Sequence, residues 1–155
     1  MSVAERLAEL GLELPDVAAP AGAYLPAVRA GSFVHTAGQL PFVAGVLPAT
    51  GKVGDADHLV SPADAQAMAV TCALNALAAA ASVLDSLDQV VRVVKVTGFV
   101  ASDPSFTGQP TVLNGASTLL GEVFGEAGRH ARSAVGVAVL PLDSPVEVEL
   151  VLEVA

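Results

Sequence analysis

The sequence predicts an α+β fold in which two helices pack on one face of a mixed sheet, in the order ββαβαββ. Two long apolar segments carry helix-capping residues, a run of β-branched residues separates them, and the C-terminal segment alternates apolar with charged residues. The chain has 155 residues, of which 53% are hydrophobic and 15% are charged. This length and composition predict one globular domain, residues 1–155, with a sizeable core.

The first 17 residues predict a helical extension ahead of the sheet. The segment MSVAERLAELGLEL places Leu7, Leu10 and Leu14 on one side of a short amphipathic helix. It lacks the basic start and the apolar stretch of a signal peptide. The chain has one cysteine, Cys72, so it forms no intramolecular disulfide. We therefore expect a cytoplasmic protein.

Two short strands are expected next, at residues 24–28 and 33–37, joined by a turn at residues 30–32. A loop rich in Gly and Pro follows, over residues 41–54.

The first long helix has clear start signals. Ser61 is a good N-cap, Pro62 fits the first helical position, and Asp64 is the acid of the first turn. The helix is expected to run to about Leu84. Residues 65–84 are uncharged, but nine of these 20 are alanine, which contributes little to membrane insertion, so we expect a buried globular helix and no membrane partner. Cys72 lies in this run and is expected to be a buried, inert thiol.

Residues 89–101 (QVVRVVKVTGFVA) predict a central strand. They are rich in β-branched residues and carry apolar residues at both odd and even positions, so both faces of the strand would be covered. A second helix is expected to begin after Asp103 or Thr107 and to end at Gly125, a natural C-cap.

Residues 132–140 and 146–154 suggest a C-terminal hairpin. Its predicted register places Val139 opposite Val146, and Ala138 opposite Glu147. One face of this hairpin would be apolar and lie under the helices. The other would carry small residues, Arg132 and the glutamates of the last strand. Because no helix is left to cover that second face, we expect it to contact another subunit.

Charge and spacing argue against several other functions. The net charge is −9, with only seven Lys and Arg, so nucleic acid is not an expected partner. The three histidines, at positions 35, 58 and 130, have no Cys or acid at ligand spacing, so neither a metal nor another cofactor is expected. The stretch GVLPATGKVG fails as a phosphate-binding loop, because its glycine spacing is wrong and Val53 stands where a hydroxyl is needed.

Three blocks of sequence resemble one known family. They are AGAYLPAVRAGSFVHTAGQLP at residues 21–41, VVKVTGFVASDPSF followed by a helix containing Asn114, and ARSAVGVAVLPLDSPVEVELVLEV at residues 131–154. The last block is the most specific, with Ala-Arg-Ser opening a strand, Leu-Pro closing it and a Glu-x-Glu strand following. The chain resembles a divergent branch of the Rid (reactive intermediate deaminase, YjgF-type) family.

This resemblance implies a chorismate-mutase-like fold, a homotrimer built as a barrel of sheets, and ligand clefts between subunits. It also implies hydrolysis of reactive enamines and imines to keto acids and ammonia. Two other classes stay open: a non-catalytic binder of small carboxylate metabolites, and, as a weaker alternative for so acidic a chain, an endoribonuclease.

The family's roles transfer to matching positions of this sequence. Arg132 would bind the substrate carboxylate, and Glu147 would orient or activate water. Tyr24, Asn114 and Gly38 would line the cleft. From the predicted hairpin register alone, Arg132 could instead pair with Glu153 across the strands.

Two positions depart from the family pattern. Ala134 replaces the usual Cys of the substrate-binding cleft, and Ala37 replaces a Ser. The resemblance implies that this Cys acts largely through its backbone carbonyl, a group that Ala134 retains. These changes alter the size and polarity of the pocket.

Overall fold

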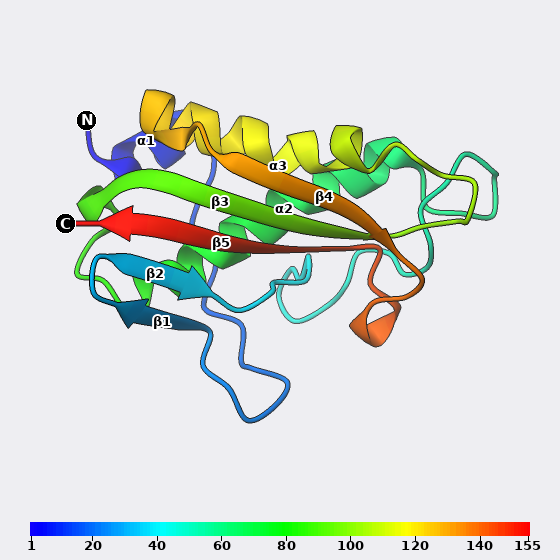
Figure 1. The fold of residues 1–155 in the computed structure, drawn as a ribbon, viewed down its shortest axis with the longest axis horizontal. Helices are drawn as coiled ribbons and strands as arrows, with labels where there is room; N and C mark the ends of the chain where they lie inside the picture. Colours follow the sequence, from blue (N-terminus) through cyan, green and yellow to red (C-terminus); the bar gives the residue numbers. More distant parts are fainter.

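The computed structural model describes residues 1–155 as a five-stranded mixed sheet with two long helices against one face (Figure 1). The strand order across the sheet is β1-β2-β5-β3-β4. The elements are α1 (Val3–Glu9), β1 (Ala27–Ala30), β2 (Phe33–Thr36), α2 (Pro62–Ala81), η1 (Leu87–Gln89), β3 (Val90–Ala101), α3 (Gln109–Phe124), η2 (Gly125–Gly128), β4 (Ala131–Val137), η3 (Pro141–Asp143) and β5 (Val146–Val154). The predicted ββαβαββ order is confirmed.

The helices begin and end close to where their capping residues place them. Ser61 accepts the Asp64 backbone N–H and Pro62 occupies the first position of α2. Helix α3 ends at Gly125, whose φ of 61° lies in the left-handed region that glycine favours. Helix α2 stops at Ala81, three residues short of the expected end. None of these helices combines the length and the apolar character needed to span a bilayer.

Small residues bring the helices into close contact with each other and with the sheet. A side chain at Gly115 of α3 would meet the Gln66 carbonyl of α2, and a side chain at Gly98 of β3 would meet Leu113 of α3. The core fills the layer between the sheet and the two helices, with Leu77, Leu120 and Leu150 among its fully buried side chains.

The predicted C-terminal hairpin is wrong. Strand β4 pairs with β3 in parallel and forms one edge of the sheet, while β5 lies between β2 and β3. Consequently Val139 does not face Val146, and Ala138 does not face Glu147. The proposed Arg132–Glu153 pair is also absent, because Glu153 lies beside Phe33 and Arg92.

The residues of β4 also face opposite sides of the sheet from those predicted, because β4 pairs with β3 and not with β5. Arg132 pairs with the buried Val96, and Ala134 pairs with Gly98, so these residues face α3. A small side chain at Ala134 suits this face, since α3 passes close by. The odd-numbered residues of β4, such as Val135, lie on the open face instead.

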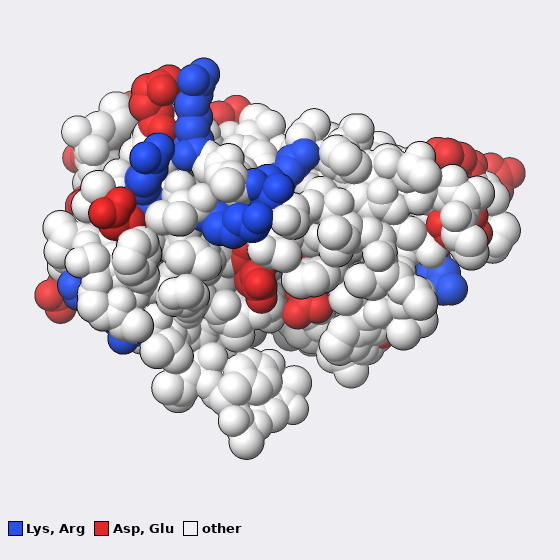
Figure 2. Space-filling model, viewed as in Figure 1, with Lys and Arg blue, Asp and Glu red and all other residues white.

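The open face of the sheet mixes charged and apolar residues. Figure 2 looks onto this face and shows basic groups gathered near acidic groups. On adjacent strands, Lys95 lies beside Val151 and Thr97 lies beside Glu149. Several apolar side chains of this face remain exposed, including Val28, Phe33 and Val135. The expectation of a sheet face that no helix covers is confirmed.

Candidate functional site

The structure divides the predicted site residues between two places. Arg132, Asn114 and Ala134 lie together where β4 meets α3. Glu147 and Gly38 lie together on the other side of the sheet, where β5 passes the end of β2.

Arg132 is held by two neutral side chains of α3. Its Nη1 donates to Asn114 Oδ1 at 2.8 Å and to Ser117 Oγ at 3.1 Å. Asn114 and Ser117 are three positions apart on the helix, so both reach the same strand. These two bonds use both hydrogens of Nη1.

The remaining side of the guanidinium, formed by Nε and Nη2, makes no hydrogen bond within the chain. No carboxylate lies within salt-bridge distance of it either, since the two ion pairs of the chain are Arg6–Glu9 and Arg129–Glu126. An unpaired, half-buried arginine is notable in a chain of net charge −9. The Nε–H and Nη2–H pair matches the two oxygens of a carboxylate.

Sequence reasoning did not identify Ser117 or His130 as part of this site. Ser117 Oγ lies 2.9 Å from His130 Nε2, and His130 Nδ1 lies 2.6 Å from the Gly128 carbonyl oxygen. The helical spacing from Asn114 to Ser117 was the available signal. The role of His130 could not be read from the sequence, because it depends on how residues 125–130 turn back along α3.

Glu147 lies over the backbone of Gly38. A side chain at position 38 would run into the Glu147 carboxylate, which would have to move to make room for it. The neighbouring backbone is fixed by a two-way pair of hydrogen bonds between Gln39 and Val148. The Glu147 carboxylate itself makes no hydrogen bond within the chain. Burial, and secondarily the nearby Glu149 carboxylate, raise the pKa of Glu147 above its usual value.

Arg132 and Glu147 cannot meet within one chain. They flank β3 on opposite sides, beside Val96 and Phe99 respectively, so they are roughly 10 Å apart along the strand and roughly 10 Å apart across it. They also point to opposite faces of the sheet.

Tyr24 stands apart from both groups. It lies exposed in the loop before β1, where its hydroxyl accepts the backbone N–H of Ala21. Ala37 follows β2 and directly precedes Gly38, and its N–H bonds to the Pro26 carbonyl. Within one chain, Tyr24 therefore contributes to neither half of the site.

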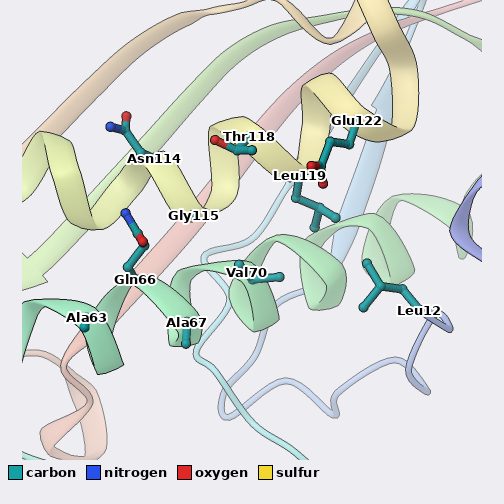
Figure 3. Close-up of a pocket in the computed structure, with 10 residues that line it drawn as sticks. All are labelled: Leu12, Ala63, Gln66, Ala67, Val70, Asn114, Gly115, Thr118, Leu119 and Glu122. Carbon is teal, nitrogen blue, oxygen red and sulfur yellow. The ribbon is translucent and has the colours of Figure 1, made fainter. Parts of the chain in front are cut away.

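A groove of about 340 Å³ runs between α2 and α3 and includes Asn114 (Figure 3). Neither Arg132 nor Glu147 lines this groove. In Figure 3 the Asn114 amide points away from α2, whereas Gln66 reaches from α2 toward α3 and donates to the Thr111 carbonyl. Asn114 thus accepts a hydrogen bond from Arg132 on the strand side of α3, whereas Gln66 links α2 to α3.

Comparison with known proteins agrees with this architecture. Residues 4–154 match the family described as "YjgF/chorismate mutase-like, putative endoribonuclease". Protein TCP17 of Trypanosoma cruzi is 47% identical over 154 residues, covering 97% of this chain and 93% of that protein.

Two solved structures are similar as well. The protein Atu1372 from Agrobacterium tumefaciens, of unknown function, is 42% identical with a TM-score of 0.89, covering 99% of this chain and 92% of that one. TdcF from E. coli, solved with bound serine, is 27% identical with a TM-score of 0.63, covering 92% and 94% of the two chains. The family match spans nearly the whole chain, and the chain therefore belongs to the YjgF/Rid family of chorismate-mutase-like fold.

Proposed function

We propose that this protein is a hydrolase that converts reactive 2-imino acids, and the enamines that tautomerise to them, into 2-keto acids and ammonia. The observation that carries the proposal is the unpaired side of the Arg132 guanidinium, with Nη1 already anchored by Asn114 and Ser117. In TdcF, a relative at 27% identity, the bound molecule is serine, which carries the same α-carboxylate.

In this proposal Arg132 binds the substrate carboxylate through Nε–H and Nη2–H, which places the adjacent C=N carbon at a fixed distance from the strand. Glu147 supplies the base. A water oxygen forms a bond to the imine carbon, its proton passes to Glu147, and the imine nitrogen takes up a proton to give a carbinolamine.

Glu147 then returns its proton to the carbinolamine nitrogen, the hydroxyl proton is lost as the C=O bond forms, and the C–N bond breaks to release ammonia and the keto acid. The sum is imine plus water giving ketone plus ammonia. The raised pKa of Glu147 makes its carboxylate a stronger base than an exposed glutamate.

The proposal requires an assembly, because Arg132 and Glu147 of one chain point to opposite faces of the sheet. We propose a homotrimer in which Arg132 of one subunit and Glu147 of the next share a cleft. The open sheet face supports this, since it combines exposed apolar side chains with Lys95 and Glu149, neither of which has an ion-pair partner in the chain. Light scattering should give three times the chain mass, and a monomer would contradict the proposal.

The catalytic proposal is tested by ammonia release from imino acids generated in the assay from amino acids by an amino-acid oxidase. The parent should accelerate release above the uncatalysed rate, and both Arg132→Ala and Glu147→Gln should abolish the acceleration. A parent protein without any acceleration, at concentrations where it is assembled, would refute the hydrolase.

A second candidate is a non-catalytic binder of small carboxylates. It is favoured by Ala37 and Ala134, which provide no polar side chain where family members have Ser and Cys. Pyruvate binding through Arg132 without ammonia release would select this candidate. RNA cleavage, which the family description suggests, has less support in a chain of net charge −9 and is tested by incubation with RNA.

A further inference from the structure

We infer that Ser117 and His130 are positioning residues that orient the Arg132 guanidinium for its ligand. The inference rests on the proposed role of Arg132 in carboxylate binding. The four groups form a hydrogen-bonded chain from Arg132 through Ser117 and His130 to the Gly128 carbonyl, with steps of 3.1, 2.9 and 2.6 Å.

The donor and acceptor in each of these hydrogen bonds can be assigned. A carbonyl oxygen can only accept, so His130 Nδ1 carries the hydrogen and donates to Gly128. In the neutral ring Nε2 is then an acceptor, and the Ser117 hydroxyl donates to it. The Ser117 oxygen is thereby left with its lone pairs free to accept from Arg132 Nη1.

The far end of these hydrogen bonds lies in a closely packed turn. Gly128 is buried, and a side chain there would run into the Leu120 carbonyl of α3. Only glycine allows residues 125–128 to lie against the last turns of α3. The His130 ring is therefore anchored to the same helix that carries Ser117 and Asn114.

The consequence for Arg132 is an oriented guanidinium. Asn114 and Ser117 take both hydrogens of Nη1, so the Nε–H and Nη2–H pair faces away from α3 and is ready for a carboxylate. An arginine that is ordered before binding loses less conformational entropy when the ligand arrives. His130 contributes by fixing the Ser117 hydroxyl, without touching the ligand.

Binding of pyruvate, measured by calorimetry on the full-length assembled protein, tests the inference. Ser117→Ala should weaken the affinity about 5- to 20-fold with unchanged stoichiometry, because the lost bond involves a charged donor. Ser117→Thr, which keeps a hydroxyl, should stay within about twofold of the parent. The matched control is Ser133→Ala, which removes a hydroxyl bonded to Lys95 at 2.9 Å, one residue from Arg132 but on the open face. It should leave pyruvate affinity unchanged.

Two substitutions at position 130 test whether His130 acts through its bond to Ser117, which orients Arg132, or only through its bond to Gly128, which holds the turn. The amide of His130→Gln can reach the Nε2 position and accept from Ser117, while the amide of His130→Asn can reach only the Nδ1 position and bond Gly128. Positioning predicts that Gln preserves pyruvate affinity better than Asn. The reverse order, or parent affinity in Ser117→Ala, would overturn the inference.

A readout without ligand distinguishes this inference from the proposed function. In nitrogen-15 NMR spectra, the Arg132 Nη1 group should rotate slowly in the parent and in Ser133→Ala, and fast in Ser117→Ala. If the parent binds no pyruvate and releases no ammonia, the proposed function fails, yet this pattern would still support positioning. Fast rotation in the parent would refute positioning whatever the activity.

Discussion

The Glu147 carboxylate occupies the space that any side chain at Gly38 would fill. This contact joins the end of β2 to the start of β5 and arises from close approach, since Gly38 has no unusual backbone angle. A substitution at Gly38 therefore acts on Glu147.

Gly38→Ala should displace the Glu147 carboxylate and lower ammonia release at least about tenfold, while pyruvate binding through Arg132 is retained. Gly121→Ala on α3 is the matched control, because a side chain there meets nothing within 4 Å. The control should keep full turnover and gain slightly in stability through better helix propensity. Unchanged turnover in Gly38→Ala would show that the Glu147 position is not critical.

Glu147→Gln should lower turnover by ~10²–10⁴-fold, the usual effect of removing a general base. Because the pKa of Glu147 is raised, its carboxylate is lost as pH falls through that value, so the parent's kcat should decline on the acid side. Pyruvate affinity measured on the same samples should change little. Full turnover in the variant would rule out Glu147 as the base.

The same substitution has a predictable effect on stability. The folded protein binds the Glu147 proton more tightly than the unfolded chain does, so this group contributes stability at low pH that is lost as pH rises through its folded pKa. Glu147→Gln should therefore be more stable than the parent at neutral pH and unfold at a higher temperature. The gain in unfolding free energy should be less than about 1 kcal/mol, because the carboxylate is only half-buried. The difference should shrink in acid. Thermal melts of both proteins across pH check the sign.

Arg132→Lys keeps the charge but loses the planar fork, so pyruvate affinity should fall about tenfold or more. Arg132→Ala should leave no measurable binding. Arg129→Lys is the matched control. Arg129 is largely exposed, and its Nε lies 3.6 Å from Glu126 Oε1 in a surface ion pair of the kind that contributes little. Equal affinity for the Arg132→Lys and Arg129→Lys variants would contradict bidentate binding.

Mixed assemblies test whether the two halves of the site come from different subunits. Arg132→Ala and Glu147→Gln are each expected to be inactive alone. Refolded together in equal amounts, they should recover about a quarter of the parent activity, because that share of subunit contacts pairs an intact Arg132 with an intact Glu147. No recovery, with mixed trimers confirmed by mass spectrometry, would contradict the shared cleft.

Cys72 should be dispensable. It is fully buried in α2, with Sγ 3.8 Å from the Val146 carbonyl, and burial raises the pKa of the thiol well above its usual value. Native protein should resist alkylation, and Cys72→Ala should cost on the order of 1 kcal/mol in unfolding free energy without changing turnover. Rapid alkylation of the native protein would show that α2 opens in solution.

The sequence by itself determined the elements and their order. Ser61 and Pro62 fixed the start of α2 and Gly125 the end of α3, since capping depends on residues close in the chain. The family pattern assigned Arg132, Asn114, Gly38 and Glu147 to one cleft, and the fold places Arg132 beside Asn114 and Glu147 beside Gly38. The alternation of β5 predicted which of its residues are buried, because the side-chain period of a strand is local.

Only the tertiary structure decided how the last two strands are arranged. Local patterns favour a hairpin between neighbouring strands, but α3 carries the chain across the sheet and returns β4 parallel to β3. Small residues on β4, which looked like a subunit contact, instead allow α3 to approach. This placement turns Arg132 toward Ser117 and His130 and away from Glu147. Such contacts join residues whose meeting depends on packing between layers, which no local pattern of the sequence encodes.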